Sequence, residues 1–187
     1  MLDTSTRTLF EAEHDAFRDT VRRVVATLDT DRHERECIVE REAWLQAGEA
    51  GMLCPTVPEE YGGLGLDFRF NAIVSEEASY AGSAVGWSLQ SDIVADYVLA
   101  YGSEEQKKKW LPRMVTGEAI TAIAMTEPGA GSDLQGMKTM ARADGNGWRL
   151  SGSKTYITNG QAADLVIVCA RTTEEGGARG ISLFLVE

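Results

Sequence analysis

Hydrophobic positions follow a helical period through the first part of the chain. Apolar residues recur at intervals of three, four and seven positions at Phe10, Phe17, Val21, Val24, Val25 and Leu28. Charged residues fill the positions between them, which is typical of an amphipathic surface helix. Thr8 followed by Glu11 resembles a capping box and indicates where this helix begins.

Helical spacing continues as far as Gly117. Further helices are predicted over residues 41–50, 70–81 and 85–101. The Pro- and Gly-rich segment 54–65 cannot be regular helix, so we expect a loop there. Ser103 with Gln106 begins one more helix, which Pro112 should break or kink because proline lacks the backbone N–H.

Beyond Gly117 the pattern changes from helices to strands. Apolar or alternating strands are predicted over residues 119–125, 138–143, 148–158, 164–170 and 181–186. Asp144-Gly-Asn-Gly147 is a strong hairpin turn between the second and third of them. Helices followed by strands predict an α+β architecture with separate domains. Strongly apolar strands should close into a barrel or pack face to face with partner strands. Because these partner strands are missing, we expect the chain to be truncated within this domain.

Composition narrows the class of protein. Hydrophobic residues make up 43% of the 187 residues, enough for a globular core, and 18 basic against 29 acidic residues give a net charge of −11. This acidity argues against nucleic-acid binding. The three cysteines are widely spaced, which predicts reduced thiols in an intracellular protein and no disulfide framework or zinc site. Because no apolar run approaches the ~20 residues that span a bilayer, we expect no membrane insertion.

Two polar loops carry the candidate chemistry. The first begins at Thr126, and its Gly129 and Gly131 allow backbone N–H groups to converge on an anion, while Ser132 adds a second hydroxyl. The other, residues 153–160, offers an aromatic ring and further hydroxyls. From the pattern alone, each segment is equally compatible with an ordinary turn rich in Gly and Ser.

Two other phosphate-binding motifs are excluded by spacing and context. The next glycine of the first loop, Gly136, comes too late for the Gly-x-Gly-x-x-Gly pattern, and no helical run opens there. Residues 147–155 nearly mimic a P-loop, but Ser153 intrudes, and the context is a strand returning from a hairpin.

Several ordered motifs together resemble the acyl-CoA dehydrogenase family. Thr126-Glu-Pro-Gly-Ala-Gly-Ser-Asp-Leu-Gln-Gly136 is similar to the family signature almost residue for residue. Ser151-Gly-Ser-Lys-Thr-Tyr-Ile-Thr-Asn-Gly160 resembles the family's second flavin-contacting strand. The family's other patterns are matched in the right order by residues 58–63, 102–108 and 180–187. Residues 133–136 and 181–187 look nearest to the long-chain branch.

The resemblance implies a fold and a reaction. Residues 1–118 would form an all-α N-terminal domain and residues 119–187 part of a β-barrel middle domain, with a C-terminal four-helix domain absent from this chain. The family uses FAD to oxidise acyl-CoA to 2,3-enoyl-CoA: a carboxylate removes the Cα proton, hydride leaves Cβ for flavin N5, and electrons pass to an electron-transfer flavoprotein. The base belongs to the absent domain, so the chain alone is expected to be inactive.

The resemblance also implies a setting for the protein. The full-length protein would form a homo-oligomer, a dimer of dimers. It would lie in the cytoplasm of a bacterium or in the mitochondrial matrix of a eukaryote.

Carried over by position, the resemblance assigns FAD-binding roles to the first loop. Ile123, Met125 and Thr126 would line the pyrimidine side of the flavin, with Thr126 bonding to its ring edge. Gly131 and Ser132 would approach the pyrophosphate, and Ser132 would also lie close to the acyl-CoA path.

The second loop would supply the remaining FAD contacts. Tyr156, which replaces the Trp of many members, would pack against the ring system, and Ile157 would fill the adjacent apolar contact. Thr158 would donate near N5. Glu127 and Asp133 look structural in the family, holding the first loop through hydrogen bonds, and are not assigned catalysis.

The remaining polar or sulfur-containing residues have simpler interpretations. His14 and His33 lie in a charged region and are interpreted as surface residues rather than ligands. The run 107–109 is interpreted as a solvated helix face. Ordinary packing accounts for the methionines at positions 114, 125, 137 and 140.

Two alternatives from other classes stay open at this point. One is an acyl-CoA oxidase or flavin monooxygenase on the same fold, in which reduced flavin reacts with oxygen. The other is a non-catalytic relative that binds acyl-CoA or a partner protein.

Overall fold

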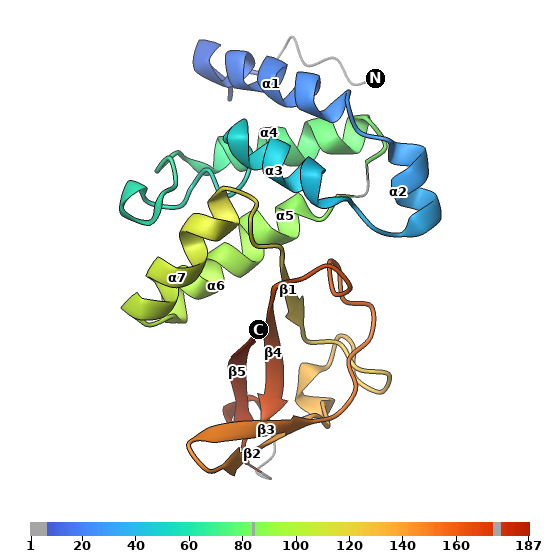
Figure 1. Cartoon of the computed structure of the whole chain (residues 1–187), viewed down its shortest axis with the longest axis vertical. Helices are drawn as coiled ribbons and strands as arrows, with labels where there is room; N and C mark the ends of the chain where they lie inside the picture. Colours follow the sequence, from blue (N-terminus) through green and yellow to red (C-terminus); the bar gives the residue numbers. More distant parts are fainter. Residues whose placement is uncertain (1–6, 84, 174–176) are drawn as a thin grey trace. The chain divides into compact units, whose positions relative to one another are not determined.

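The computed structural model describes residues 7–83, 85–173 and 177–187. The chain divides into two compact units, Met1–Ala119 and Ile120–Glu187. The first is helical and the second contains a mixed sheet of five strands, so the predicted α+β architecture is confirmed (Figure 1). No helix within the described ranges is long and apolar enough to cross a membrane.

The helical unit contains the predicted helices and one that the pattern missed. Its helices are α1 (Ala12–Val25), α2 (Thr30–Glu36), α3 (Arg41–Glu49), α4 (Phe68–Tyr80), α5 (Trp87–Leu89), α6 (Ala95–Tyr101) and α7 (Glu104–Val115). A π-helical turn, Gln90–Val94, joins α5 to α6, and a 3₁₀ turn, Glu59–Tyr61, lies in the predicted loop 54–65. The sequence of α2, Thr-Asp-Arg-His-Glu-Arg-Glu, has no apolar stripe, so periodicity could not detect it.

Of the two effects expected at Pro112, a break or a kink, the break does not occur. Ser103 and Gln106 form the expected capping box, and α7 continues through Pro112 to Val115. Proline removes one backbone hydrogen bond, but the buried side chains of Leu111 and Met114 hold the helix against the core on both sides of it.

The expected surface positions of both histidines are also wrong. His14 is 0% exposed and packs against Phe70, with ring centroids 4.6 Å apart. It completes a capping box with Glu11, which corrects the predicted cap at Thr8 by three residues. His33 is 4% exposed, and its Nε2 lies 2.7 Å from a carboxylate oxygen of Glu40. A histidine ring is mostly apolar, so it can be buried once a polar atom has a partner.

The sheet unit is organised around one central strand. Its strands are β1 (Thr121–Ala124), β2 (Met140–Asp144), β3 (Gly147–Ser151), β4 (Leu165–Arg171) and β5 (Ile181–Val186). β4 pairs with β1 in parallel and with β5 antiparallel, while β2 and β3 form the predicted hairpin. β2 joins β4 only through the pair Met140 and Arg171. Two 3₁₀ turns, Leu134–Gly136 and Ala178–Gly180, lie in the connecting loops.

The predicted strand over residues 148–158 is correct only over its first four residues. β3 ends at Ser151, and residues 152–160 are irregular. Tyr156 and Asn159 have φ angles of 56° and 65°, in the left-handed region that a strand does not use.

The direction of this irregular segment depends on a close approach at Gly152. A Cβ atom there would lie 2.3 Å from Thr139 Oγ1 and 2.7 Å from Thr139 Cα, distances that only glycine avoids. At Gly129, by contrast, a Cβ would meet nothing within 4 Å.

We therefore expect Gly152→Ala to lower the free energy of unfolding by about 2 kcal/mol or more, because the methyl group must displace backbone. Gly129→Ala is the matched control and should change it by less than about 0.5 kcal/mol. Urea denaturation of both variants measures the difference. Equal stability of the two variants would contradict the close approach.

Candidate functional site

The first predicted loop leaves the sheet at the end of β1 and returns along the same edge of β4. β1 pairs with the first half of β4, ending at Ala124 opposite Val168, and β2 rejoins it at Arg171. Because β5 occupies the other edge of β4, residues 125–139 must project beside the second half of β4. The sheet thus presents this loop as a surface feature on a rigid base.

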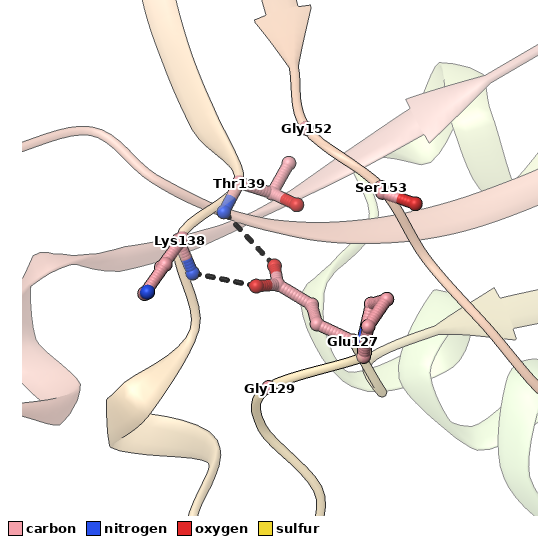
Figure 2. Close-up of a pocket in the computed structure, with 7 residues that line it drawn as sticks. Glu127, Gly129, Lys138, Thr139, Gly152 and Ser153 are labelled. Atoms are coloured by element: carbon pink, nitrogen blue, oxygen red, sulfur yellow. Dashed lines mark hydrogen bonds between the residues drawn. The ribbon is translucent and has the colours of Figure 1, made fainter.

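Glu127 anchors the loop. Its carboxylate accepts hydrogen bonds from the N–H groups of Lys138 (2.6 Å) and Thr139 (2.9 Å), as Figure 2 shows. The Lys154 Nζ lies 3.0 Å from the same carboxylate. The backbone groups of Glu127 and Ala130 also bond to each other at 2.9 and 3.1 Å, which closes the turn between them. The structural interpretation of Glu127 is therefore confirmed.

These contacts shift the protonation of Glu127. Burial by itself raises the pKa of the carboxyl group, but the hydrogen bonds from Thr139, Lys138 and Lys154 outweigh it and lower the pKa from 4.5 to about 2. Asp133 has the other predicted structural role: its Oδ1 accepts the N–H of Gln135 at 3.1 Å and begins the 3₁₀ turn.

The structure brings the two predicted loops together. The Thr155 N–H donates to the Thr126 carbonyl at 3.0 Å. Lys154 Nζ donates to the Met125 carbonyl, also at 3.0 Å. Farther along the second loop, the Asn159 side-chain amide donates to the Thr121 carbonyl at 3.0 Å and ties the segment to β1. The two segments therefore form one surface, although 27 positions separate Glu127 from Lys154.

A small apolar cluster supports the first loop from the sheet. Its buried members are Ala130, Met137 and Cys169, with Met125, Leu134 and Ile181 packed against it. Burial raises the pKa of the Cys169 thiol, although Lys154 opposes this shift. The apolar cluster and the Glu127 hydrogen bonds therefore hold the loop through different residues.

The predicted residues of the first loop differ in accessibility. Ile123, on β1, is only 6% exposed, and Met125 and Thr126 are partly buried at the point where the chain leaves the sheet. Gly131 and Ser132 are exposed at the far end of the loop. A Cβ at Gly131 would meet nothing within 4 Å, so the loop surface there is open.

The predicted residues of the second loop are mostly exposed. Tyr156 is 92% exposed and combines this exposure with a positive φ. Such a conformation costs an aromatic residue on the order of 1–3 kcal/mol, and strain of this kind concentrates at functional sites. Ile157 is half-buried and Thr158 is exposed.

A cavity of about 290 Å³ lies beside the paired loops (Figure 2). It is lined by Glu127, Pro128, Gly129, Lys138, Thr139, Gly152 and Ser153. None of the eight predicted FAD-contacting residues lines it. The cavity is therefore adjacent to the predicted site and does not define it.

Sequence reasoning missed the residues that join the loops. The motif assigns no separate role to Lys154, Asn159 or Gly152, yet they make the contacts that position the second loop. One signal was available for Lys154. It is a lone cation in a segment rich in hydroxyls, and the first loop contains the buried acid Glu127 as a partner.

A group of potential metal ligands occurs in the helical unit, at Glu11, Glu13 and His14. The Glu11 side chain already caps α1, and His14 Nδ1 accepts the Glu11 N–H at 3.1 Å. These donors are engaged in helix capping, so we assign no metal to them.

Both halves of the chain match domains of a known protein family. Residues 11–118 match the acyl-CoA dehydrogenase N-terminal domain, and residues 122–187 match the acyl-CoA dehydrogenase middle domain. The mitochondrial long-chain specific acyl-CoA dehydrogenase of Sus scrofa is 49% identical over 193 residues, which cover 100% of this chain and 45% of that protein.

Solved structures agree with this assignment. An acyl-CoA dehydrogenase from Geobacillus kaustophilus matches with a TM-score of 0.91 and 46% identity, over 97% of this chain and 50% of its own. A glutaryl-CoA dehydrogenase from Mycobacterium smegmatis, solved in complex with FADH2, matches with a TM-score of 0.84 and 33% identity. The match covers 97% of this chain and 47% of that chain. The chain spans about half the length of these relatives. Because the two family domains match in order along nearly all of its length, this chain belongs to the acyl-CoA dehydrogenase family.

Proposed function

We propose that the full-length protein carrying this chain is an FAD-dependent acyl-CoA dehydrogenase that converts acyl-CoA thioesters to 2,3-enoyl-CoA. The observation that carries the proposal is the hydrogen-bonded pairing of the two loops through Thr126 and Thr155. Residues 1–118 supply the helical domain, and residues 119–187 supply the part of the β domain that contacts flavin. The family relationship and the glutaryl-CoA dehydrogenase solved with FADH2 support both the reaction and the cofactor.

The residues present fit FAD. A flavin needs hydrogen-bond donors and an aromatic or apolar face, and its pyrophosphate needs N–H or hydroxyl donors. Tyr156 offers an exposed ring, and Thr158 an exposed hydroxyl. At the other end of the paired loops, Gly131 leaves the backbone open to close approach beside the Ser132 hydroxyl.

Each residue then has a stated role. Thr126 and Thr158 would donate to the flavin ring system, Tyr156 would pack against it, and Ile123, Met125 and Ile157 would supply apolar contacts. Gly131 and Ser132 would hold the pyrophosphate, and Ser132 would also contact acyl-CoA. Bound FAD would accept the hydride that leaves the substrate Cβ. The chain's task is to orient that acceptor on a surface fixed before the substrate arrives.

Glu127 is unsuitable as the base that removes the Cα proton. A general base needs a pKa near the working pH, and the pKa of Glu127 is held at about 2. Both of its oxygens are also occupied by N–H donors and by Lys154. We propose that the base lies outside residues 1–187, so this chain alone is expected to form no enoyl-CoA.

The partners and substrate follow from the family relationship. A long-chain acyl-CoA is the substrate supported by the 49% identity to the long-chain enzyme of Sus scrofa. We propose an electron-transfer flavoprotein as the electron acceptor and a dimer of dimers as the assembly. The proposed location is the mitochondrial matrix, as for that relative, or the cytoplasm if the source is bacterial.

The first test is flavin content and turnover of the full-length protein. We expect it to purify with flavin absorbance that bleaches when long-chain acyl-CoA is added without oxygen. Short-chain acyl-CoA should react more slowly. Rapid reoxidation by oxygen would identify an oxidase instead. A protein that neither contains FAD nor can be reconstituted with it would be a non-catalytic relative.

The two threonines provide a residue-level test. Thr126→Val and Thr158→Val keep the side-chain shape and remove the hydroxyl, so each should raise the Kd for FAD about tenfold, the effect of one lost hydrogen bond. Thr20→Val, at a half-buried position of α1 in the helical unit, is the matched control and should leave the Kd unchanged. Fluorescence titration of the apoprotein measures it, and equal Kd values in all three variants would refute the assignment.

Glu127 should also make stability depend on pH. Its folded pKa of about 2 lies below its usual 4.5, so its contribution is present above pH 4.5 and is lost as pH falls through 2. Glu127→Gln should be less stable at neutral pH and should lack this acid-dependent loss. Urea denaturation over this range tests it, with exposed Glu105→Gln as control. A variant with the same pH profile as the wild type would show that Glu127 makes no such contribution.

A further inference from the structure

Lys154 occupies an unusual position for a lysine. Its side chain is only 12% exposed, although it follows the edge hairpin β2–β3 and belongs to a surface loop. A largely buried ammonium group is costly unless it is paired. Lys154 meets this requirement with two acceptors, the Met125 carbonyl and a Glu127 carboxylate oxygen, each at 3.0 Å.

These two acceptors lie on either side of Thr126. The residue after Lys154 completes the set, because the Thr155 N–H donates to the Thr126 carbonyl itself. Three consecutive residues of the first loop are therefore bonded by two consecutive residues of the second. Residues Tyr156–Thr158 follow directly after these hydrogen bonds. The bonds therefore set the position of Thr158 relative to Thr126.

Lys154 is not needed to anchor the first loop. Glu127 retains its bonds from the Lys138 and Thr139 N–H groups without it, and the Ala130, Met137 and Cys169 cluster supports the loop from the sheet. The second loop has weaker support. Beyond Thr155, the bond from Asn159 to the Thr121 carbonyl ties it back to the sheet. Loss of Lys154 should therefore move Tyr156–Thr158 relative to Thr126 while the sheet unit stays folded.

The geometry points to Lys154 as a positioning residue. It fixes Tyr156–Thr158 relative to Thr126, so that the FAD-contacting residues of the two loops lie at the positions that FAD requires. This inference rests on the proposed function. Lys154 acts through its neighbours, because its donors are directed at Met125 and Glu127. The strained φ of Tyr156 fits such a role, since a neighbouring constraint is needed to hold an unfavourable backbone conformation.

The test uses the full-length protein with Lys154→Met, which keeps the chain length and removes the charge. We expect the Kd for FAD to rise about 10- to 100-fold, the effect of losing charge-assisted hydrogen bonds, and the flavin absorption band to change shape. Lys154→Arg keeps the charge and donors and should recover most of the affinity. Lys138→Met is the matched control: its side chain is exposed, and the bond from its backbone N–H to the Glu127 carboxylate is unaffected.

The outcomes separate positioning from simple stabilisation. A Lys154→Met protein that unfolds more easily but binds FAD with wild-type Kd and spectrum would overturn the inference. If Lys154→Met does not fold, Lys154→Gln keeps a hydrogen-bond donor and removes only the charge. It should bind FAD with an intermediate Kd, and a wild-type value would again overturn the inference. A wild-type protein that binds no FAD would refute the proposed function itself, and this inference with it.

Discussion

The buried carboxylate of Glu127 is the constraint on which the geometry of the paired loops depends. A single side chain receives two backbone N–H groups from the chain entering β2 and the ammonium group of Lys154 from the chain leaving β3. Each of these donors is at least partly buried. Removing the carboxylate would leave them without partners, and an unpaired buried donor costs more free energy than a hydrogen bond contributes to stability. The carboxylate therefore holds three segments of chain together at one point.

The sheet explains why this point lies where it does. β4 pairs with β1 along its first half and with β2 only at its end, which leaves residues 125–139 to form a loop against the second half of the strand. If β1 continued to pair with β4 beyond Val168, this edge of β4 would not be open to the loop. The small cluster around Met137 and Cys169 packs against Met125 and Leu134 of this loop. Loop placement and strand pairing are thus two consequences of the same topology.

The low pKa of Glu127 makes this residue unsuitable as a catalytic base. The charge of Glu127 is used to stabilise the loop, and its low pKa means that it stays ionised across the whole neutral range. Among the residues predicted to contact FAD, those exposed on the paired loops are Gly131, Ser132, Tyr156 and Thr158. They can bind and orient a cofactor, and none of them is a carboxylate.

The sequence by itself determined the α+β class, most helices and strands, the hairpin turn and the two loops, because these depend on local periodicity and on turn residues. It missed α2, which has no apolar stripe, and it placed His14 and His33 at the surface, because polarity does not reveal a buried partner. Only the tertiary structure decided that β3 ends at Ser151 and that Lys154 joins the loops. Those features depend on contacts between residues far apart in the chain, such as Gly152 with Thr139 and Lys154 with Glu127, which no local pattern encodes.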